Sequence, residues 1–211
     1  GAFVDLSGGA LGGDAGFAEI SAGVSLHAAG LFDATAPRGR LGTVLFDPRD
    51  IVIRDGSSAL IGPDEFINVS VVETPGNVIL EADRNLFVTT DIFKPSGTGS
   101  LTLRAGLDPG NGQGDIVLGE YPFGFIPGDL SIQADALVFD ARRDILNNVA
   151  LGANLFASLS GISLTARTGS IAVNRVETLT PGNNISWTQA ESLAFSAAPG
   201  GVFPNAANAT F

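Results

Sequence analysis

The sequence predicts an all-β protein, a right-handed parallel β-helix (β-solenoid) that forms a single body over residues 1–211. Three observations predict it: runs of alternating apolar residues recur along the chain, the turn formers Gly and Pro number 28 and 11, and apolar residues seldom recur at helical spacing. The alternative is an ordinary β-sandwich, which also has short alternating strands. The repeats favour the β-solenoid, with roughly seven to nine coils of about 20 to 30 residues each.

One repeat accounts for most of the prediction. A turn with Gly or Asn precedes an alternating apolar run, and a short break and a second run follow. The copies lie at 76–88, 99–119, 128–140, 161–173 and 183–195. Their first apolar residues are Val78, Leu101, Leu130, Ile162 and Ile185, and four positions later stand Ala82, Ala105, Ala134, Ala166 and, in the fifth copy, Gln189. We expect the first four apolar residues to stack as a core ladder about 4.8 Å apart, with a corner at each alanine.

Alternation predicts which side chains face the core, because successive residues of a strand point to opposite faces. Leu101 and Leu103 should point inward, and Thr102 and Arg104 outward. Trp187 takes an inward position in the fifth copy. The two segments 108–114 and 120–128 interrupt the repeats, and we expect both to protrude as loops.

The composition excludes several functions. Asp and Glu total 22 against 11 Lys and Arg, a net charge of −11, so nucleic acid and anionic membranes are unfavourable partners. No Cys is present, which excludes disulfides, thiolate zinc sites and Cys nucleophiles. No Met is present either, even at position 1, so we expect a processed chain or a portion of a longer one.

Few residues offer catalytic chemistry. The only histidine, His27, follows an alternating run at a position that should face solvent. Asp47 and Asp50 could place two carboxylates for acid–base chemistry on a polysaccharide. A turn at Asp47-Pro48, with Asp50 and Arg54 paired on an outer face, explains the same residues without chemistry. We therefore predict no catalytic residue.

The two loops contain the remaining candidates. Residues 110–118 partly match a calcium-binding nonapeptide, but only one copy exists, so we predict no metal ligand and no cofactor. The loop at 120–128 carries Tyr121, Phe123 and Phe125, which are candidate contacts for a partner or a glycan. Folding back over an apolar face is the other interpretation of these aromatic residues.

Four segments of the N-terminal quarter match a known family pattern: Gly16 to Ser21, Asp33 to Pro37, Gly42 to Pro48, and Asp50-Ile51. Through them, residues 12–53 resemble the repeat region of filamentous-haemagglutinin-like exoproteins of two-partner secretion systems. The later copies, with their Gly-x-Ile-x-Leu-x-Ala form, are similar to that family too. The resemblance implies a right-handed parallel β-helix, export through an outer-membrane transporter, and adhesion or biofilm roles. The family's secretion domain, with its Asn-Pro-Asn-Gly motif, is not seen, so we expect an internal or C-terminal portion or a shorter relative.

The leading functional hypothesis is a secreted scaffold or adhesin without catalysis, located on the cell surface or in an extracellular filament. Its expected partners are further coils of a longer parent chain or head-to-tail copies of itself, host or matrix glycans, and the outer-membrane transporter during export. Neither end of the chain has the polar cap that closes a solenoid, which favours such stacking. The alternative is a polysaccharide-binding or polysaccharide-degrading β-helix protein. The enzyme is disfavoured because no two copies place acids at the same offset.

Overall fold

The computed structural model describes residues 3–23, 26–56, 66–108, 110, 112–121, 124–125, 130–147, 154–173, 175–178, 184–189, 193–195 and 209–210. Within these ranges the chain consists of short strands and one short helix, α1 (Val69–Val72). The strands of the two large sheets pair in parallel. The protein is therefore all-β with parallel sheets, and the antiparallel sandwich considered from the sequence is wrong.

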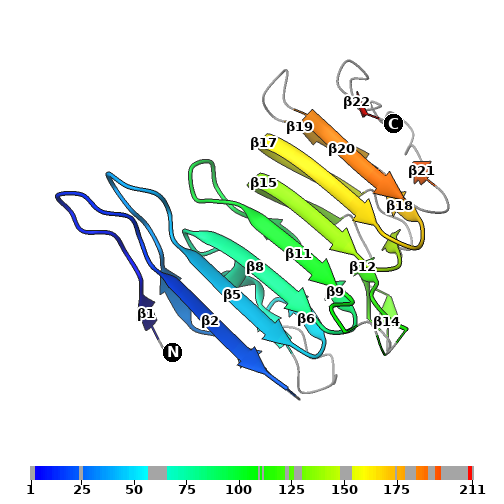
Figure 1. Cartoon of the computed structure of the whole chain (residues 1–211), viewed down its shortest axis with the longest axis horizontal. Coiled ribbons are helices and arrows are strands. Elements are labelled where there is room, and N and C mark those ends of the chain that lie inside the picture. Colours follow the sequence, from blue (N-terminus) through cyan, green and yellow to red (C-terminus); the bar gives the residue numbers. More distant parts are fainter. Residues whose placement is uncertain are drawn as a thin grey trace.

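The chain alternates between two parallel sheets (Figure 1). The larger sheet runs in the order β2 (Phe17–Ala22), β5 (Thr43–Pro48), β8 (Asn77–Ala82), β11 (Leu101–Ala105), β15 (Leu130–Ala141), β17 (Asn154–Ala166), β20 (Asn184–Gln189) and β22 (Ala209–Thr210), with β10 (Ile92–Phe93) also on β15 and β19 (Arg175–Thr178) on β17. The second sheet runs in the order β21 (Leu193–Phe195), β18 (Ile171–Val173), β16 (Ile145–Asn147), β12 (Ile116–Leu118), β9 (Leu86–Val88), β6 (Ile51–Arg54), β7 (Phe66–Asn68) and β3 (His27–Ala28). Because the main path of the larger sheet follows chain order, this sheet extends in one direction along the molecule.

The predicted alternation is confirmed in the strands of the larger sheet. In β11, Leu101, Leu103 and Ala105 are buried, whereas Thr102 and Arg104 lie half-buried on the outer face. The second sheet differs, since all three residues of β12 are buried. A strand covered on both faces tolerates a continuous apolar run, as is usual in parallel sheets.

The predicted core ladder is correct at Val78, Leu101 and Ile162 and wrong at Leu130. Val78 is in register with Leu101, as expected. Leu101 is in register with Leu137, and Leu137 with Ile162. Leu130 is buried, but it lies opposite Asn154 in a different row.

The error at Leu130 has a structural cause. Strand β15 contains two runs of the same form, Leu-Ser-Ile-Gln-Ala at 130–134 and Leu-Val-Phe-Asp-Ala at 137–141. The first run pairs with β10 and the second with β11, and the register with β17 shifts between Ala134 and Ala136. We call each stretch of chain that contributes one strand to the main path of the larger sheet a pass. The alanine that aligns with Ala105 in the pass of β15 is Ala141, so the predicted corner at Ala134 is wrong.

Lys94 is an unexpected cation in the core. It is 0% exposed, and its Nζ donates hydrogen bonds to the carbonyl oxygens of Val72 at 3.1 Å and Thr74 at 2.6 Å. Both carbonyls lie at the C-terminal end of α1, whose N-terminus is capped by the Asn68 side chain. Burial lowers the pKa of Lys94 to about 8.

Turns stack closely between passes where glycine permits it. Gly76 and Gly99 have φ angles of +128° and +114°, a region that side chains disfavour. A Cβ on Gly99 would lie 2.3 Å from the carbonyl oxygen of Gly76. Successive turns can therefore lie in contact only because neither residue has a side chain.

The two segments that interrupt the repeats differ in local structure, and their protrusion from the body stays a prediction. The described residues between β11 and β12 contain no strand. The second segment contains β13 (Glu120–Tyr121) and β14 (Gly124–Phe125), an antiparallel hairpin outside both large sheets. At the N-terminal end, β1 (Phe3–Asp5) pairs with β4 (Leu31–Asp33). No helix in the described ranges has the length and apolar character needed to span a membrane.

Candidate functional site

A row of polar residues stands directly before five strands of the second sheet, β6, β9, β12, β16 and β18: Asp50, Asn85, Asp115, Asp144 and Ser170. Each Oδ1 in the row accepts the backbone N–H of the next member. The distances are 3.2 Å from Asp50 to Asn85 N, 3.0 Å from Asn85 to Asp115 N, 3.3 Å from Asp115 to Asp144 N and 2.7 Å from Asp144 to Ser170 N. The row therefore satisfies backbone donors at the corner where the chain enters the second sheet.

Arginines neutralise the acids of this row. The guanidinium of Arg143 lies 2.8 Å from Asp115. Burial raises the pKa of Asp115, and the Arg143 charge opposes that shift. Asp50 pairs with Arg84 and lies 3.8 Å from Arg49. These ion pairs lie in the turns, and they occupy the carboxylates of Asp50 and Asp115 with arginine partners.

Two details of the sequence interpretation are wrong here. Asp50 pairs with Arg84 of the next pass, not with Arg54, whose guanidinium lies 3.8 Å above the Phe66 ring. Asp47-Pro48 ends strand β5, so the turn begins after the proline. Asp47 stands on the outer face, where burial and the charges of neighbouring acids raise its pKa.

Replacing Asn85 tests the capping role of the polar row. Its Oδ1 accepts N–H bonds from both Gly114 at 3.1 Å and Asp115 at 3.0 Å. We expect Asn85→Leu to reduce the free energy of unfolding by about 2 kcal/mol, because two partly buried donors lose their acceptor. Asn85→Asp retains the acceptor and should lose clearly less. Urea denaturation followed by circular dichroism measures both, and equal losses would contradict the capping role.

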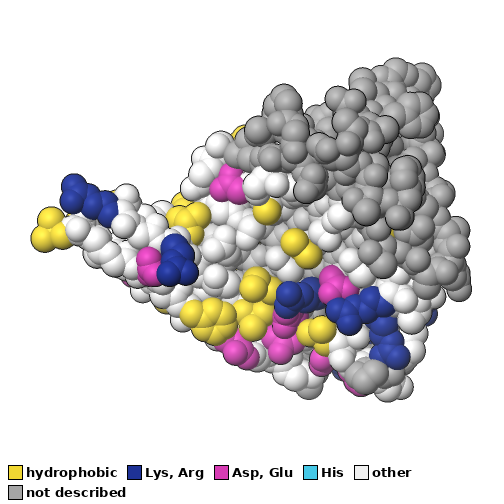
Figure 2. All heavy atoms as spheres, turned by 45° about the horizontal axis from the view of Figure 1, so that its top comes forward, with side chains coloured by type: hydrophobic (Ala, Val, Ile, Leu, Met, Phe, Trp, Pro, Cys, Tyr) yellow, Lys and Arg dark blue, Asp and Glu magenta, His cyan; other side chains and the backbone are white. Residues whose placement is uncertain are grey.

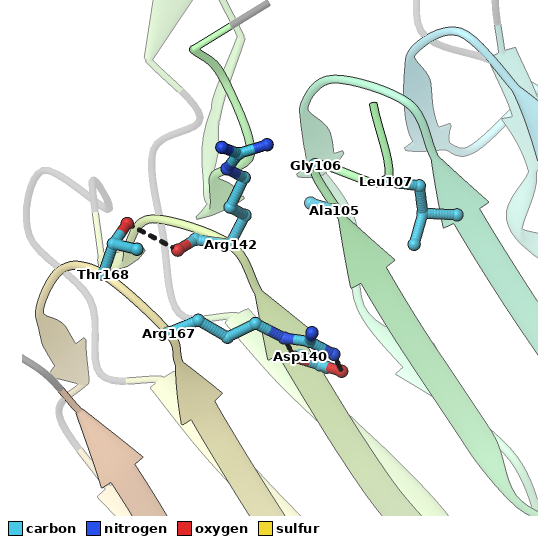
Figure 3. Close-up of a pocket in the computed structure, with 7 residues that line it drawn as sticks. All are labelled: Ala105, Gly106, Leu107, Asp140, Arg142, Arg167 and Thr168. Carbon is cyan, nitrogen blue, oxygen red and sulfur yellow. Dashed lines mark hydrogen bonds and ion pairs between the residues drawn. The ribbon is translucent and has the colours of Figure 1, made fainter. Parts of the chain in front are cut away.

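A pocket of roughly 310 Å³ lies at the ends of three strands of the larger sheet. Figure 3 shows the turns after β11, β15 and β17 converging on it. The lining residues are Ala105, Gly106, Leu107, Asp140, Arg142, Arg167 and Thr168. The lining thus combines an apolar side, a glycine and two guanidinium groups against one carboxylate.

One wall of the pocket is formed by an ion pair between Arg167 and Asp140. Arg167 binds Asp140 through two hydrogen bonds, Nε to Oδ1 at 2.8 Å and Nη2 to Oδ2 at 2.6 Å. The hydrogen bonds and charge of Asp140 raise the pKa of Arg167 further. Thr168 Oγ1 donates to the carbonyl oxygen of Arg142 at 2.8 Å. Arg167, Asp140 and Thr168 therefore each have a partner within the protein at this wall.

Arg142 differs from the arginines around it. Its Cβ lies so close to the facing turn that a Cβ on Gly106 would come within 2.5 Å of it, and one on Gly114 within 2.6 Å. Its side chain is half-buried. Among the described residues, its guanidinium makes no ion pair and no hydrogen bond. The Cβ of Arg142 is therefore packed against the facing turn, while its guanidinium has no protein partner among the described residues.

The structure tests the sequence candidates only in part. His27 is exposed, as predicted, and its ring lies 4.7 Å from that of Phe66. The backbones of Tyr121 and Phe125 lie in the hairpin, but their side chains, and all of Phe123, lie outside the described residues. Their contact with a glycan or partner stays a prediction. Trp187 is in register with the buried Leu164, while its side chain lies outside the described residues.

The sequence interpretation missed both the polar row and the pocket. The row had a usable signal, because Asp, Asn or Ser precedes Ile or Leu before β6, β9, β12, β16 and β18. The pocket had none, because its walls come from three separate passes. In the described part of the chain, no group of three or more His, Asp or Glu residues could hold a metal ion. Figure 2 shows Lys and Arg side chains interleaved with Asp and Glu on the described surface, so the charges form no single-sign patch on that face.

The comparisons with known proteins identify no relative. No protein-family model matches the chain, no curated protein matches its sequence, and no solved structure matches its fold.

Proposed function

We propose that this chain is a length of a secreted, extracellular or cell-surface fibre scaffold, folded as a right-handed parallel β-helix and without catalysis. The observation that carries the proposal is the register of the larger sheet. Its main path takes eight strands in chain order, with buried residues in line from Val44 through Val78, Leu101 and Leu137 to Ile162. A body built this way lengthens by adding passes, which suits a rod.

The resemblance of residues 12–53 to filamentous-haemagglutinin-like exoproteins supports the same function. The matched segments coincide with real elements, since 42–48 covers β5 and Asp50-Ile51 begins β6. On this proposal the protein leaves the cell through an outer-membrane transporter. Adhesion to host or matrix glycans would then be a property of its turns and loops.

The edge strand β2 supports stacking with further coils or with head-to-tail copies. In the described residues β2 pairs with β5 alone, so its other edge has no strand partner. Phe17 in this strand is 60% exposed, and the inward-facing Ile20 is only half-buried. An edge of this kind offers backbone hydrogen bonds and apolar surface to another parallel strand.

Light scattering and negative-stain electron microscopy of the purified 211-residue chain test the fibre proposal. We expect the mass to rise with concentration and rods of constant width to form. Phe17→Lys should suppress this assembly by placing a charge on the β2 edge. Phe93→Lys is the matched control, because Phe93 is similarly exposed at 56% but belongs to β10. A compact monomer at high concentration, unaffected by either substitution, would overturn the proposal.

A further inference from the structure

We propose that the pocket formed by the turns after β11, β15 and β17 binds the carboxylate of a sugar acid, with Arg142 as the anchoring cation. This inference rests on the glycan adhesion of the proposed function, for which it names a ligand class, and it does not depend on assembly. Three lining residues of the pocket, Gly106, Arg142 and Arg167, directly follow the aligned alanines of the larger sheet.

The first argument is charge. Arg143, the neighbour of Arg142, forms an ion pair with Asp115 at 2.8 Å, and Arg167 forms one with Asp140. Only the guanidinium of Arg142 has no such partner among the described residues that surround the pocket. A guanidinium matches a carboxylate in planar, two-pronged geometry. The net charge of −11 and the Asp140 carboxylate in the wall disfavour polyvalent anions, so a single carboxylate fits best.

The second argument is the rest of the lining. Leu107 is 43% exposed and supplies an apolar side, which suits the C–H face of a sugar ring. The hydroxyl of Thr168 already donates its proton to Arg142 O, so it offers lone pairs to a ligand hydroxyl. Figure 3 shows Arg142 and Leu107 on different turns, with the Arg167–Asp140 pair between and below them. A carboxylate, hydroxyl donors and an apolar face together describe a uronic acid.

Saturation-transfer NMR tests the proposal, because it detects weakly bound ligands whether the protein is a monomer or a filament. The probes are methyl β-D-glucuronide and its neutral counterpart, methyl β-D-glucoside. We expect saturable transfer to the glucuronide and at least tenfold weaker binding of the glucoside. Equal transfer to both sugars, or none to either, would overturn the assignment.

Variants locate the binding in the pocket. Arg142→Gln retains the Cβ that packs on Gly106 and should weaken glucuronide binding at least tenfold. Arg143→Gln removes a charge one residue away that is already paired with Asp115, and should leave binding within twofold. An equal effect of the two substitutions would point to general electrostatics and reject the site. A glucuronate oligosaccharide that binds as well as the single sugar identifies a polysaccharide as the source, whereas binding of the single sugar alone identifies a free sugar acid.

Discussion

Between pH 8 and pH 10.5 the protein is expected to become more stable to unfolding, by on the order of 3 kcal/mol. The cause is Lys94, whose pKa in the folded state is about 8 against an ordinary value of 10.5. In that interval the unfolded chain holds a proton that the folded chain has released, so stability rises with pH. Below pH 8 both states are protonated, and the cost of the buried charge is present in full.

The composition makes this measurement unusually clean. Lys94 is the only lysine, and Tyr121 is the only tyrosine. Urea unfolding across this interval should show the rise in the natural protein and none in Lys94→Met. The substitution leaves the carbonyls of Val72 and Thr74 without this donor, so above pH 10 the variant should be the less stable protein. Parallel curves for the two proteins would show that Lys94 does not carry the effect.

Phe139→Ala is expected to reduce the free energy of unfolding by about 3 to 5 kcal/mol. Phe139 is 0% exposed and lies in register between Leu103 and Leu164, which are themselves fully buried. Removing the ring leaves a cavity that two well-packed neighbouring strands cannot close. The urea midpoint, followed by circular dichroism, measures the loss.

Val138→Ala is the matched control for Phe139→Ala. Val138 is the preceding residue of β15, and its side chain lies half-buried on the outer face. We expect a loss below about 1 kcal/mol, because little buried volume is removed. Similar losses for the two variants would mean that the second run of β15 does not face the core as the register requires.

Much of the fold could be predicted because the signal is local. Alternation in a strand such as β11 places Leu101 and Leu103 inward whatever the strand pairs with. Register is different, since it depends on which of two similar runs meets the neighbouring strand. In β15 both runs end in alanine, at Ala134 and Ala141, and the sequence offers no local reason to prefer the second.

The buried lysine and the pocket could not be predicted from local alternation either, but the cause is different. Lys94 follows Ile92-Phe93 and precedes a proline, a pattern typical of an exposed turn. The carbonyls at the end of α1 and the charges of Asp135 and Glu73 compensate for its burial. The pocket joins Leu107, Asp140 and Arg167, which are far apart in the sequence. Such sites arise from stacking, and stacking is settled by register rather than by composition.

The unequal passes of the larger sheet have a consequence for how such a protein can evolve. From Val78 to Ile185 the aligned residues are 23, 36, 25 and 23 positions apart, yet each row stays in line. Insertions and deletions are therefore absorbed between the aligned segments, in stretches that include the β13–β14 hairpin and the first run of β15. A one-residue change inside a strand would instead turn every inward side chain outward. Lineages of this protein are expected to drift in loop length and to gain or lose whole passes by recombination, while aligned five-residue segments such as 101–105 and 137–141 remain fixed in length.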